Sequence, residues 1–353
     1  MSRIFSRSPY IIEIDESGQT SSKIELTLWN GSTEPSAPQY ILSKNIPASN
    51  LTQTLYNVSP YIREYFNFNQ FSGNAGAYET PTSTNFYVNV RIKRFATDSS
   101  GESELDSTVY TAFDGFGKYE EGSNPDLGKV LLSEGVYTYY KKGNYSNQDR
   151  LSGSITFDAE AGDVVRYTNL STGTVNNFTI SSDGVTNFDR LYTPNRTNGN
   201  KVEFLEGGSS IVWTATFKPI EECKYTPIYI DFINRYGAWS RMFMYKTSKK
   251  SLSVTSNDYN LMQSNLVNYD VKEGQKQQFN ISGQESIKVN SGWVHEDFGS
   301  HLQELIMSER ILVNNRPAKC KTTSLDIQTG LDDKTISYSL DFDFNNDFIN
   351  SVI

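Results

Sequence analysis

Apolar and polar residues alternate along much of this chain, and a period of two predicts β-strands. In residues 23–31 (KIELTLWNG), the expected core face carries Ile24, Leu26 and Leu28, and the other face carries Glu25, Thr27 and Trp29. In residues 85–95 (NFYVNVRIKRF), the inward set is Phe86, Val88, Val90 and Ile92. Short runs of the same kind recur towards the end of the chain. The pattern therefore predicts a mainly β protein.

A helical period occurs in two places. In residues 56–66 (YNVSPYIREYF), Ser59 is the expected N-cap and Pro60 fits the first turn. The second place is residues 292–311, where apolar residues recur at the spacing of a helix that lies on a core. That stripe consists of Phe298, Leu302, Leu305 and Ile306. We expect one or two short helices.

Both histidines belong to this second region, and their spacing argues against zinc. A zinc-hydrolase helix places two histidines four residues apart, with a glutamate after the first. His295 and His301 are six residues apart, with Gly299 between them. On a helix, six residues would leave the two rings about 120° apart. We interpret the pair as part of the polar face of a helix and expect no metal there.

Changes in composition divide the chain into three parts. Residues 1–143 predict an N-terminal β-rich domain. Residues 144–218 predict a small β-sandwich, with an insertion as one interpretation, because turn signals recur about every ten residues. Residues 219–353 predict a C-terminal β domain with one amphipathic helix; within it, 277–290 (QQFNISGQESIKVN) resembles a hairpin and 255–265 is a polar stretch. The expected fold is two to three β-sandwich or β-barrel-like domains.

Composition narrows the class of protein. The chain has 353 residues, a mass of 39.9 kDa and a formal net charge of -9, so nucleic acid and anionic membranes are poor default partners. No apolar run suits a leader or a membrane span, and we expect no membrane insertion. Cys223 and Cys320 are too few for a disulfide framework. We expect reduced thiols and folding in a cytoplasm.

The candidate chemistry is weak. Residues 341–347 (DFDFNND) begin like a calcium loop, but the sixth and twelfth positions are Asn346 and Val352 where such a loop needs Gly and Glu. Strand alternation with Phe342 and Phe344 inward explains the segment better. The acids of residues 112–128 indicate a surface loop, although two acids across a cleft would suit glycoside hydrolysis. We expect no catalytic residues, no cofactor and no metal.

Aromatic residues offer the better candidates for binding. Tyr residues cluster in 137–145 (YTYYKKGNY), and the turn NRYGAW brings together three residue types that anchor protein interfaces. The candidate interface residues are Arg235, Tyr236, Trp239, Tyr139, Tyr140 and Tyr145. Two alternatives stay open: the Tyr cluster could stack on sugar rings, and Tyr236 and Trp239 could fill a core.

Four segments together carry a family resemblance: RSPYIIEI (7–14), YNVSPYIREYF (56–66), CKYTPIYIDFINRYGAW (223–239) and GWVHEDFGSHLQELIMSERI (292–311). In this order, before a strand-rich end, they resemble β-rich tail ring and hub proteins of tailed bacteriophages, nearest to those of crAss-like phages. The resemblance covers both ends of the chain and leaves residues 144–218 uncovered. Its motifs are turns and strands, so it implies no active-site residues.

The resemblance implies a structural virion protein, assembled in the host cytoplasm and located in the tail. Such a subunit forms a homo-oligomeric ring about the tail axis and docks other tail or connector proteins. An acidic ring would let DNA pass passively, without sequence-specific contacts. A head-to-tail contact that closes a ring needs two different faces on each subunit. The alternative is a carbohydrate-binding adhesin or receptor-binding tail protein, and an enzyme acting on glycans is a third hypothesis.

Overall fold

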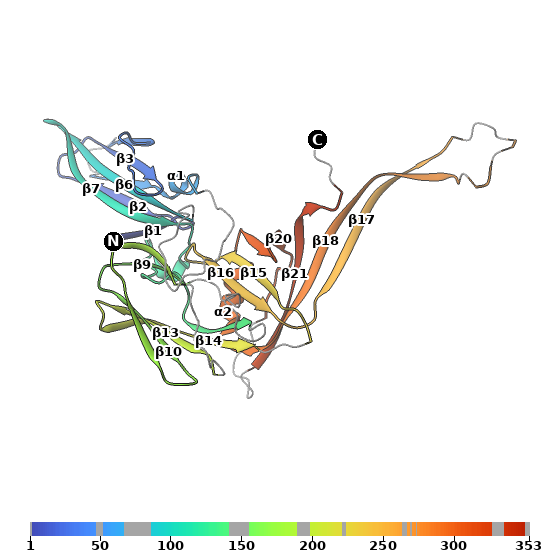
Figure 1. The fold of residues 1–353 in the computed structure, drawn as a ribbon. Coiled ribbons are helices and arrows are strands. Elements are labelled where there is room, and N and C mark those ends of the chain that lie inside the picture. Colours follow the sequence, from blue (N-terminus) through green and yellow to red (C-terminus); the bar gives the residue numbers. More distant parts are fainter. Residues whose placement is uncertain are drawn as a thin grey trace.

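The structure, a computed structural model, describes residues 2–46, 52–66, 86–140, 155–188, 198–220, 224–262, 267–268, 270–272, 274–326 and 335–349. Strands dominate these residues. The two α-helices among them, α1 (Ser59–Arg63) and α2 (Phe298–Ile306), are short, as is the 3-10 helix η1 (Tyr119–Glu121). The prediction of a mainly β fold is confirmed. Figure 1 shows sheets that meet around α2 and a two-stranded ribbon that projects from them.

The first sheet is built from the N-terminal part of the chain. Its strand order is β1-β7-β6-β3-β4, and only the β1–β7 pair is parallel. The strands are β1 (Ser2–Phe5), β3 (Ser21–Trp29), β4 (Tyr40–Asn45), β6 (Tyr87–Asp98) and β7 (Gly101–Phe113). A second pair, β2 (Ile11–Asp15) and β5 (Gln53–Asn57), packs with α1 on this sheet.

The predicted alternation in β3 and β6 is largely confirmed. The inward residues Ile24, Leu26, Leu28, Phe86, Val88, Val90 and Ile92 are all buried. Thr27 and Trp29 lie on the opposite face, as predicted, and are also buried. A period of two predicts which side of the sheet each residue faces, but not whether that side is covered. It therefore does not reveal a strand whose two faces are both covered at one end.

Helix α1 begins one residue earlier than expected. Val58 holds the N-cap position and Pro60 lies in the first turn, so Ser59 is helical and was wrongly predicted to be the cap. The Ser59 hydroxyl instead accepts the N–H of Tyr10 at 2.8 Å and donates to the carbonyl of Ser8 at 2.6 Å. Ser59 therefore ties the helix to the chain just before β2.

The second sheet has the order β11-β10-β13-β14-β8. Its strands are β8 (Gly135–Tyr140), β10 (Val164–Asn169), β11 (Val175–Thr179), β13 (Asn200–Glu206) and β14 (Ser210–Ile220), with the pair β9 (Ile155–Ala159) and β12 (Gly184–Phe188) beside it. β8 lies within the range 1–143 but pairs in parallel with β14. Residues 135–140 thus belong to the second sheet. The sequence did not show this, because alternation predicts a strand but not the strand that it pairs with.

The third sheet contains seven strands in the order β16-β15-β19-β20-β21-β18-β17. These are β15 (Ile228–Ile233), β16 (Trp239–Met244), β17 (Lys249–Asn260), β18 (Lys276–His295), β19 (Ile311–Val313), β20 (Arg316–Cys320) and β21 (Thr335–Asp347). Helix α2 packs on it through the predicted residues Phe298, Leu302 and Leu305. Phe342 and Phe344 point into the same core, so the strand interpretation of 341–347 is confirmed.

One prediction in this region was wrong. Residues 277–290 do not turn back as a hairpin, because they belong to the single twenty-residue strand β18. The actual hairpin joins β18 to β17, which includes residues 255–260 of the stretch interpreted as polar. Asn280 adopts a φ of 50°, and the β17–β18 register shifts beside it. The residues that looked like a turn therefore form a bulge within a strand.

Candidate functional site

The turn between β15 and β16 joins the N-terminal part of the chain to the third sheet. Asn234 is fully buried there, and its Oδ1 accepts the N–H groups of Tyr236 at 3.0 Å and Ala238 at 3.1 Å. Its Nδ2 donates to the carbonyl of Leu131 and the hydroxyl of Ser240, both at 2.8 Å. One side chain therefore fixes the turn and holds it against the segment that leads into β8.

The same turn touches the end of β7 backbone to backbone. The N–H of Phe116 donates to the carbonyl of Arg235 at 2.7 Å. Gly237 has a φ of 81°, and a Cβ at this position would lie 2.6 Å from the amide nitrogen of Asp114. A side chain at Gly237 would thus be strained and would also push the two segments apart.

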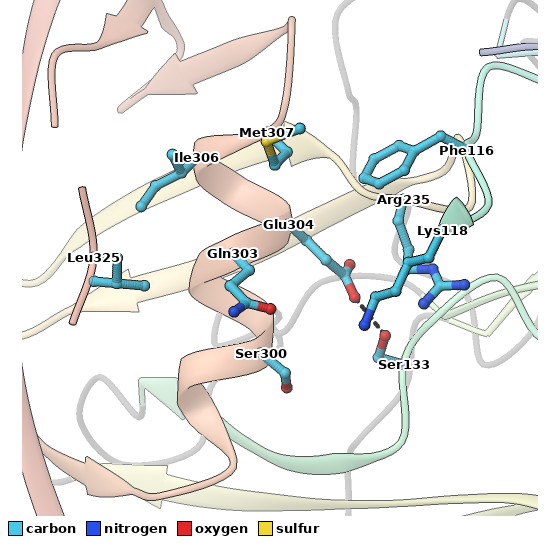
Figure 2. A pocket seen from close by; sticks show the side chains of 10 residues that line it. All are labelled: Phe116, Lys118, Ser133, Arg235, Ser300, Gln303, Glu304, Ile306, Met307 and Leu325. Atoms are coloured by element: carbon cyan, nitrogen blue, oxygen red, sulfur yellow. Dashed lines mark hydrogen bonds between the residues drawn. The ribbon is translucent and has the colours of Figure 1, made fainter. Parts of the chain in front are cut away.

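A cavity of about 360 Å³ lies beside this contact. It is bounded by the segment after β7, the segment before β8, the β15–β16 turn and α2, so all three sheet regions contribute (Figure 2). Its lining consists of Phe116, Lys118, Ser133, Arg235, Ser300, Gln303, Glu304, Ile306, Met307 and Leu325. We call this cavity the junction pocket.

Helix α2 presents one face to the junction pocket and another to the core. Ser300, Gln303, Glu304 and Met307 follow at intervals of three and four residues, which places them along one side of the helix. Phe298, Leu302 and Leu305 bury the opposite side. The apolar stripe that predicted the helix therefore also fixes which residues face the pocket.

Glu304 is the buried charge-bearing group of the pocket. Only 8% of the residue is exposed, and its carboxylate accepts a hydrogen bond from the Ser133 hydroxyl (Figure 2). Burial raises the pKa of the Glu304 carboxyl above its ordinary value, while the Ser133 hydroxyl and the backbone N–H of Arg235 act in the opposite direction. Burial is the largest of these effects, so the net shift of the pKa is upward.

Two cationic side chains and two apolar side chains lie on opposite sides of the Glu304 carboxyl. Figure 2 shows Lys118 and Arg235 on one side of the carboxyl and Ile306 and Leu325 on the other. The Arg235 guanidinium pairs with Glu121, with Nη2 at 2.6 Å from Oε1. Arg235 also lies over the Tyr236 ring, 5.3 Å from its centroid. The pocket thus offers apolar surface beside positive charge, which suits an amphipathic group.

The two histidines occupy separate environments. His301 is buried, stacks on Tyr137 with a centroid distance of 4.0 Å, and places Nε2 at 3.4 Å from the carbonyl of Glu134. Burial lowers the pKa of His301 to about 4. His295 is partly exposed beside Asp297. In the described ranges, no group of three or more His, Cys, Asp or Glu side chains is placed to hold a metal ion.

The structure separates the predicted interface residues. Trp239 and Tyr139 are 9% and 2% exposed and belong to the core, so neither can anchor a partner from this position. Tyr236 is half-buried and reaches Ser133, and Arg235 lies in the junction pocket. Tyr140 is described only through its backbone in β8, and Tyr145 lies outside the described residues. The core alternative therefore holds for Trp239.

The most exposed part of the third sheet was not among the candidates. β17 and the first half of β18 project from the body and form what we call the arm (residues 249–260 and 276–287; Figure 1). β21 pairs with β18 from Gln284 onwards, so the arm is a two-stranded ribbon only in its outer part, from Val254 and Gly283 outwards. Every residue of β17 is exposed. At about 3.4 Å per residue, its twelve residues span roughly 40 Å. A matching signal was present in the sequence: Leu252 and Val254 alternate with Ser and Thr.

The arm carries apolar side chains into solvent. Leu252 and Val254 are 49% and 59% exposed, and Phe348, which follows β21, is 61% exposed. Leu252 and Phe348 meet over Gly283, where an added Cβ would lie 3.2 and 3.1 Å from them. Because a two-stranded ribbon is marginally stable alone in water, this surface is expected to gain from a partner.

Comparison with known proteins adds no family to these observations: no family model and no curated protein sequence matches the chain. No helix in the described part of the chain is long and apolar enough to cross a membrane.

Proposed function

We propose that this protein is a structural subunit of a bacteriophage tail, a ring or hub component that oligomerises and docks other tail proteins. The observation that carries the proposal is the arm, because a strand of twelve exposed residues buries little against its own chain. An extended edge of this kind is a template for contact with another chain. The resemblance of four segments to tail ring and hub proteins supplies the biological setting.

The junction supports the same role. The Asn234 side chain ties the β15–β16 turn to the segment before β8, and Gly115 and Gly237 let this turn meet the end of β7 backbone to backbone. A subunit built this way presents its outer faces at fixed angles, which a closed ring requires of neighbouring copies. The net charge of -9 adds a second compatible property, since an acidic bore repels phosphate and lets DNA slide.

The test is to image the purified full-length chain by negative-stain microscopy and to measure its native mass, alone and with neighbouring tail proteins. Closed rings, or incorporation into tails detected by antibody labelling, would support the proposal. A particle map that lacks this polypeptide would contradict it. A variant with Leu252→Ser and Val254→Ser keeps the charge of the arm and should be incorporated into tails less well than the wild type.

The second candidate, a carbohydrate-binding adhesin, is favoured by exposed aromatic rings outside the core. Trp293 on β18 is 70% exposed and Tyr119 is fully exposed. Such rings stack on sugars. Retention of host glycans on an array, lost in Trp293→Ala or Tyr119→Ala, would favour the adhesin. Degradation of those glycans, abolished by an acid-to-amide change, would indicate an enzyme.

A further inference from the structure

The outer edge of β17 lacks the features that usually prevent strands from pairing. β17 is the last strand of its sheet, and its partner among the described residues is β18. Natural edges are blunted by prolines, by charges or by bulges in the edge strand itself. β17 contains no proline, its central segment 251–257 (SLSVTSN) contains no charge, and the extra residue of the bulge is on β18.

The sequence of β17 is complementary to itself in the antiparallel direction. Lys250 and Asp258 each lie four residues from Val254, on opposite sides of it. Lys249 and Tyr259 each lie five residues from it. In the part of the chain that the structure describes, neither Lys250 nor Asp258 belongs to an ion pair. Two antiparallel copies centred on Val254 would therefore place opposite charges face to face at both ends.

We propose that two copies of this chain pair through β17, antiparallel, with a two-fold axis at Val254. In this register Lys250 of one copy faces Asp258 of the second copy, and Lys249 faces Tyr259. Lys beside Asp and Lys beside an aromatic ring are both favourable cross-strand neighbours. Val254 meets its own equivalent at the axis. A two-fold contact uses the same surface on both subunits, so this self-complementary arrangement is what it requires.

The apolar residues of the arm lie where this pairing would cover them. Lys250 and Val254 pair with Ile287 and Gly283 of β18, so Leu252 and Val254 share the face that Ile287 turns to the core. Pairing about Val254 brings the Leu252–Val254 stripes of two copies side by side on one face. The two β17–β18 ribbons then form one sheet of at least four strands with an apolar face, the arrangement that gives such ribbons independent stability.

The opposite edge strand of the same sheet, β16, is a poor alternative partner for β17 of a second copy. β16 is that edge, and five of its six residues are buried against the body. A head-to-tail continuation of the seven-stranded sheet from one copy to the next would therefore have to uncover core residues. The inferred contact is distinct from the ring contact of the proposed function, since two-fold pairing does not close a ring.

A charge exchange tests the register. The full-length protein and the variants Lys250→Asp, Asp258→Lys and the double exchange are compared by sedimentation over a range of concentrations. Each single change places like charges together twice per dimer and should raise the dissociation constant of the dimer by roughly tenfold or more. The double exchange restores both pairs and should return it to near the wild-type value. Lys276→Asp, on the inner strand, is the matched control and should change it little.

A cysteine at the axis gives an independent readout. Val254→Cys should form a disulfide-linked dimer on mild oxidation, because only at the axis does a residue face its own equivalent. Asp258→Cys lies eight residues from its equivalent in the proposed register and should not cross-link, since about 27 Å would separate the two positions. The wild type, which has Cys223 and Cys320, serves as the background.

The outcomes separate the alternatives. A protein that stays monomeric at high concentration would overturn the inference, and so would a dimer that is indifferent to Lys250→Asp and does not cross-link as Val254→Cys. Cross-linking of Asp258→Cys with equal yield would overturn the register. Rings that form normally while the β17 dimer is absent would overturn this inference alone, whereas a β17 dimer without rings or tail incorporation would contradict only the proposed function.

Discussion

Arg3 and Asp158 form a buried ion pair between β1 and β9, with Nε at 2.8 Å from Oδ2. The Arg3 guanidinium also donates to the backbone carbonyl of Asp158 at 3.1 Å. Both side chains are nearly inaccessible to water. Burial raises the pKa of the Asp158 carboxyl, and the neighbouring Arg3 opposes that rise. This pair links the N-terminal sheet to the β9–β12 pair across 155 positions of sequence.

Arg3→Met should lower the free energy of unfolding by about 3–5 kcal/mol, because it leaves the Asp158 carboxylate buried without its partner. The matched control is Arg91→Met, which breaks a half-exposed pair with Glu34 and should cost at most about 1 kcal/mol. Urea unfolding of both variants measures the difference. Equal losses of unfolding free energy in the two variants would show that burial does not increase the contribution of the Arg3–Asp158 pair.

The buried acid of the junction pocket should make stability depend on pH. Burial raises the pKa of Glu304 above 4.5, so the folded protein holds this proton more tightly than the unfolded chain does. The associated stability is complete below pH 4.5 and is lost as the pH rises through the folded pKa. Glu304→Gln stays neutral, so its free energy of unfolding relative to wild type should increase from about pH 4 to about pH 7.

The control for Glu304→Gln is Glu120→Gln, which changes an exposed acid in η1. Its free energy of unfolding relative to wild type should stay nearly constant over the same range. A parallel pH dependence in the two variants would contradict the role of burial at Glu304.

His301 should make stability depend on pH in the direction opposite to that of Glu304. Its pKa falls from 6.5 to about 4 on folding, so the unfolded chain binds the proton more tightly. The stability that His301 contributes is present above pH 6.5 and is lost as the pH falls towards 4, by roughly 3 kcal/mol in total. His301→Gln should lack this acid-side loss, as measured by thermal or urea unfolding at several pH values. An unchanged slope would contradict the assignment.

Trp239→Ala should destabilise the free subunit by about 3–5 kcal/mol, because the ring fills the core where the N-terminal and third sheets meet. Trp293→Ala, at an exposed tryptophan, should stay within about 0.5 kcal/mol. Chemical unfolding of the isolated subunit measures both. A neutral Trp239→Ala would indicate that this ring serves a contact with another chain.

Much of the fold could be predicted from period-two patterns, because side chains on one face of a strand share one environment. Phe342 and Phe344 illustrate this, and so do Leu302 and Leu305 for the helical period. The pairing of β8 with β14 could not be predicted, since register and partner depend on contacts distant in sequence. The hairpin predicted for 277–290 failed for a local reason: Asn280 adopts a positive φ, which occurs in turns and in bulges alike, and here it lies beside a bulge.

The site was harder to predict than the fold. Asn234 and Gly237 mark a turn in sequence, but only the structure shows that this turn meets Leu131 and Asp114. Tryptophan is a residue type that is common at interfaces, yet the position of Trp239 beside the turn places it in the core. The arm could not be predicted because its alternation of apolar and polar residues is short, covering only Leu252 and Val254 in β17. Exposure of both faces is a property of the whole molecule, which a local pattern does not contain.

β18 runs without interruption from the outer part of the arm to His295, two residues before the N-cap of α2. Its hydrogen bonds to β21 lie across the strand direction, so a pull along the arm strains them together rather than one after another. Tension applied at the far end would thus be resisted in shear and transmitted to the helix that lines the junction pocket. The arm is therefore anchored so that it can transmit force to the body of the subunit.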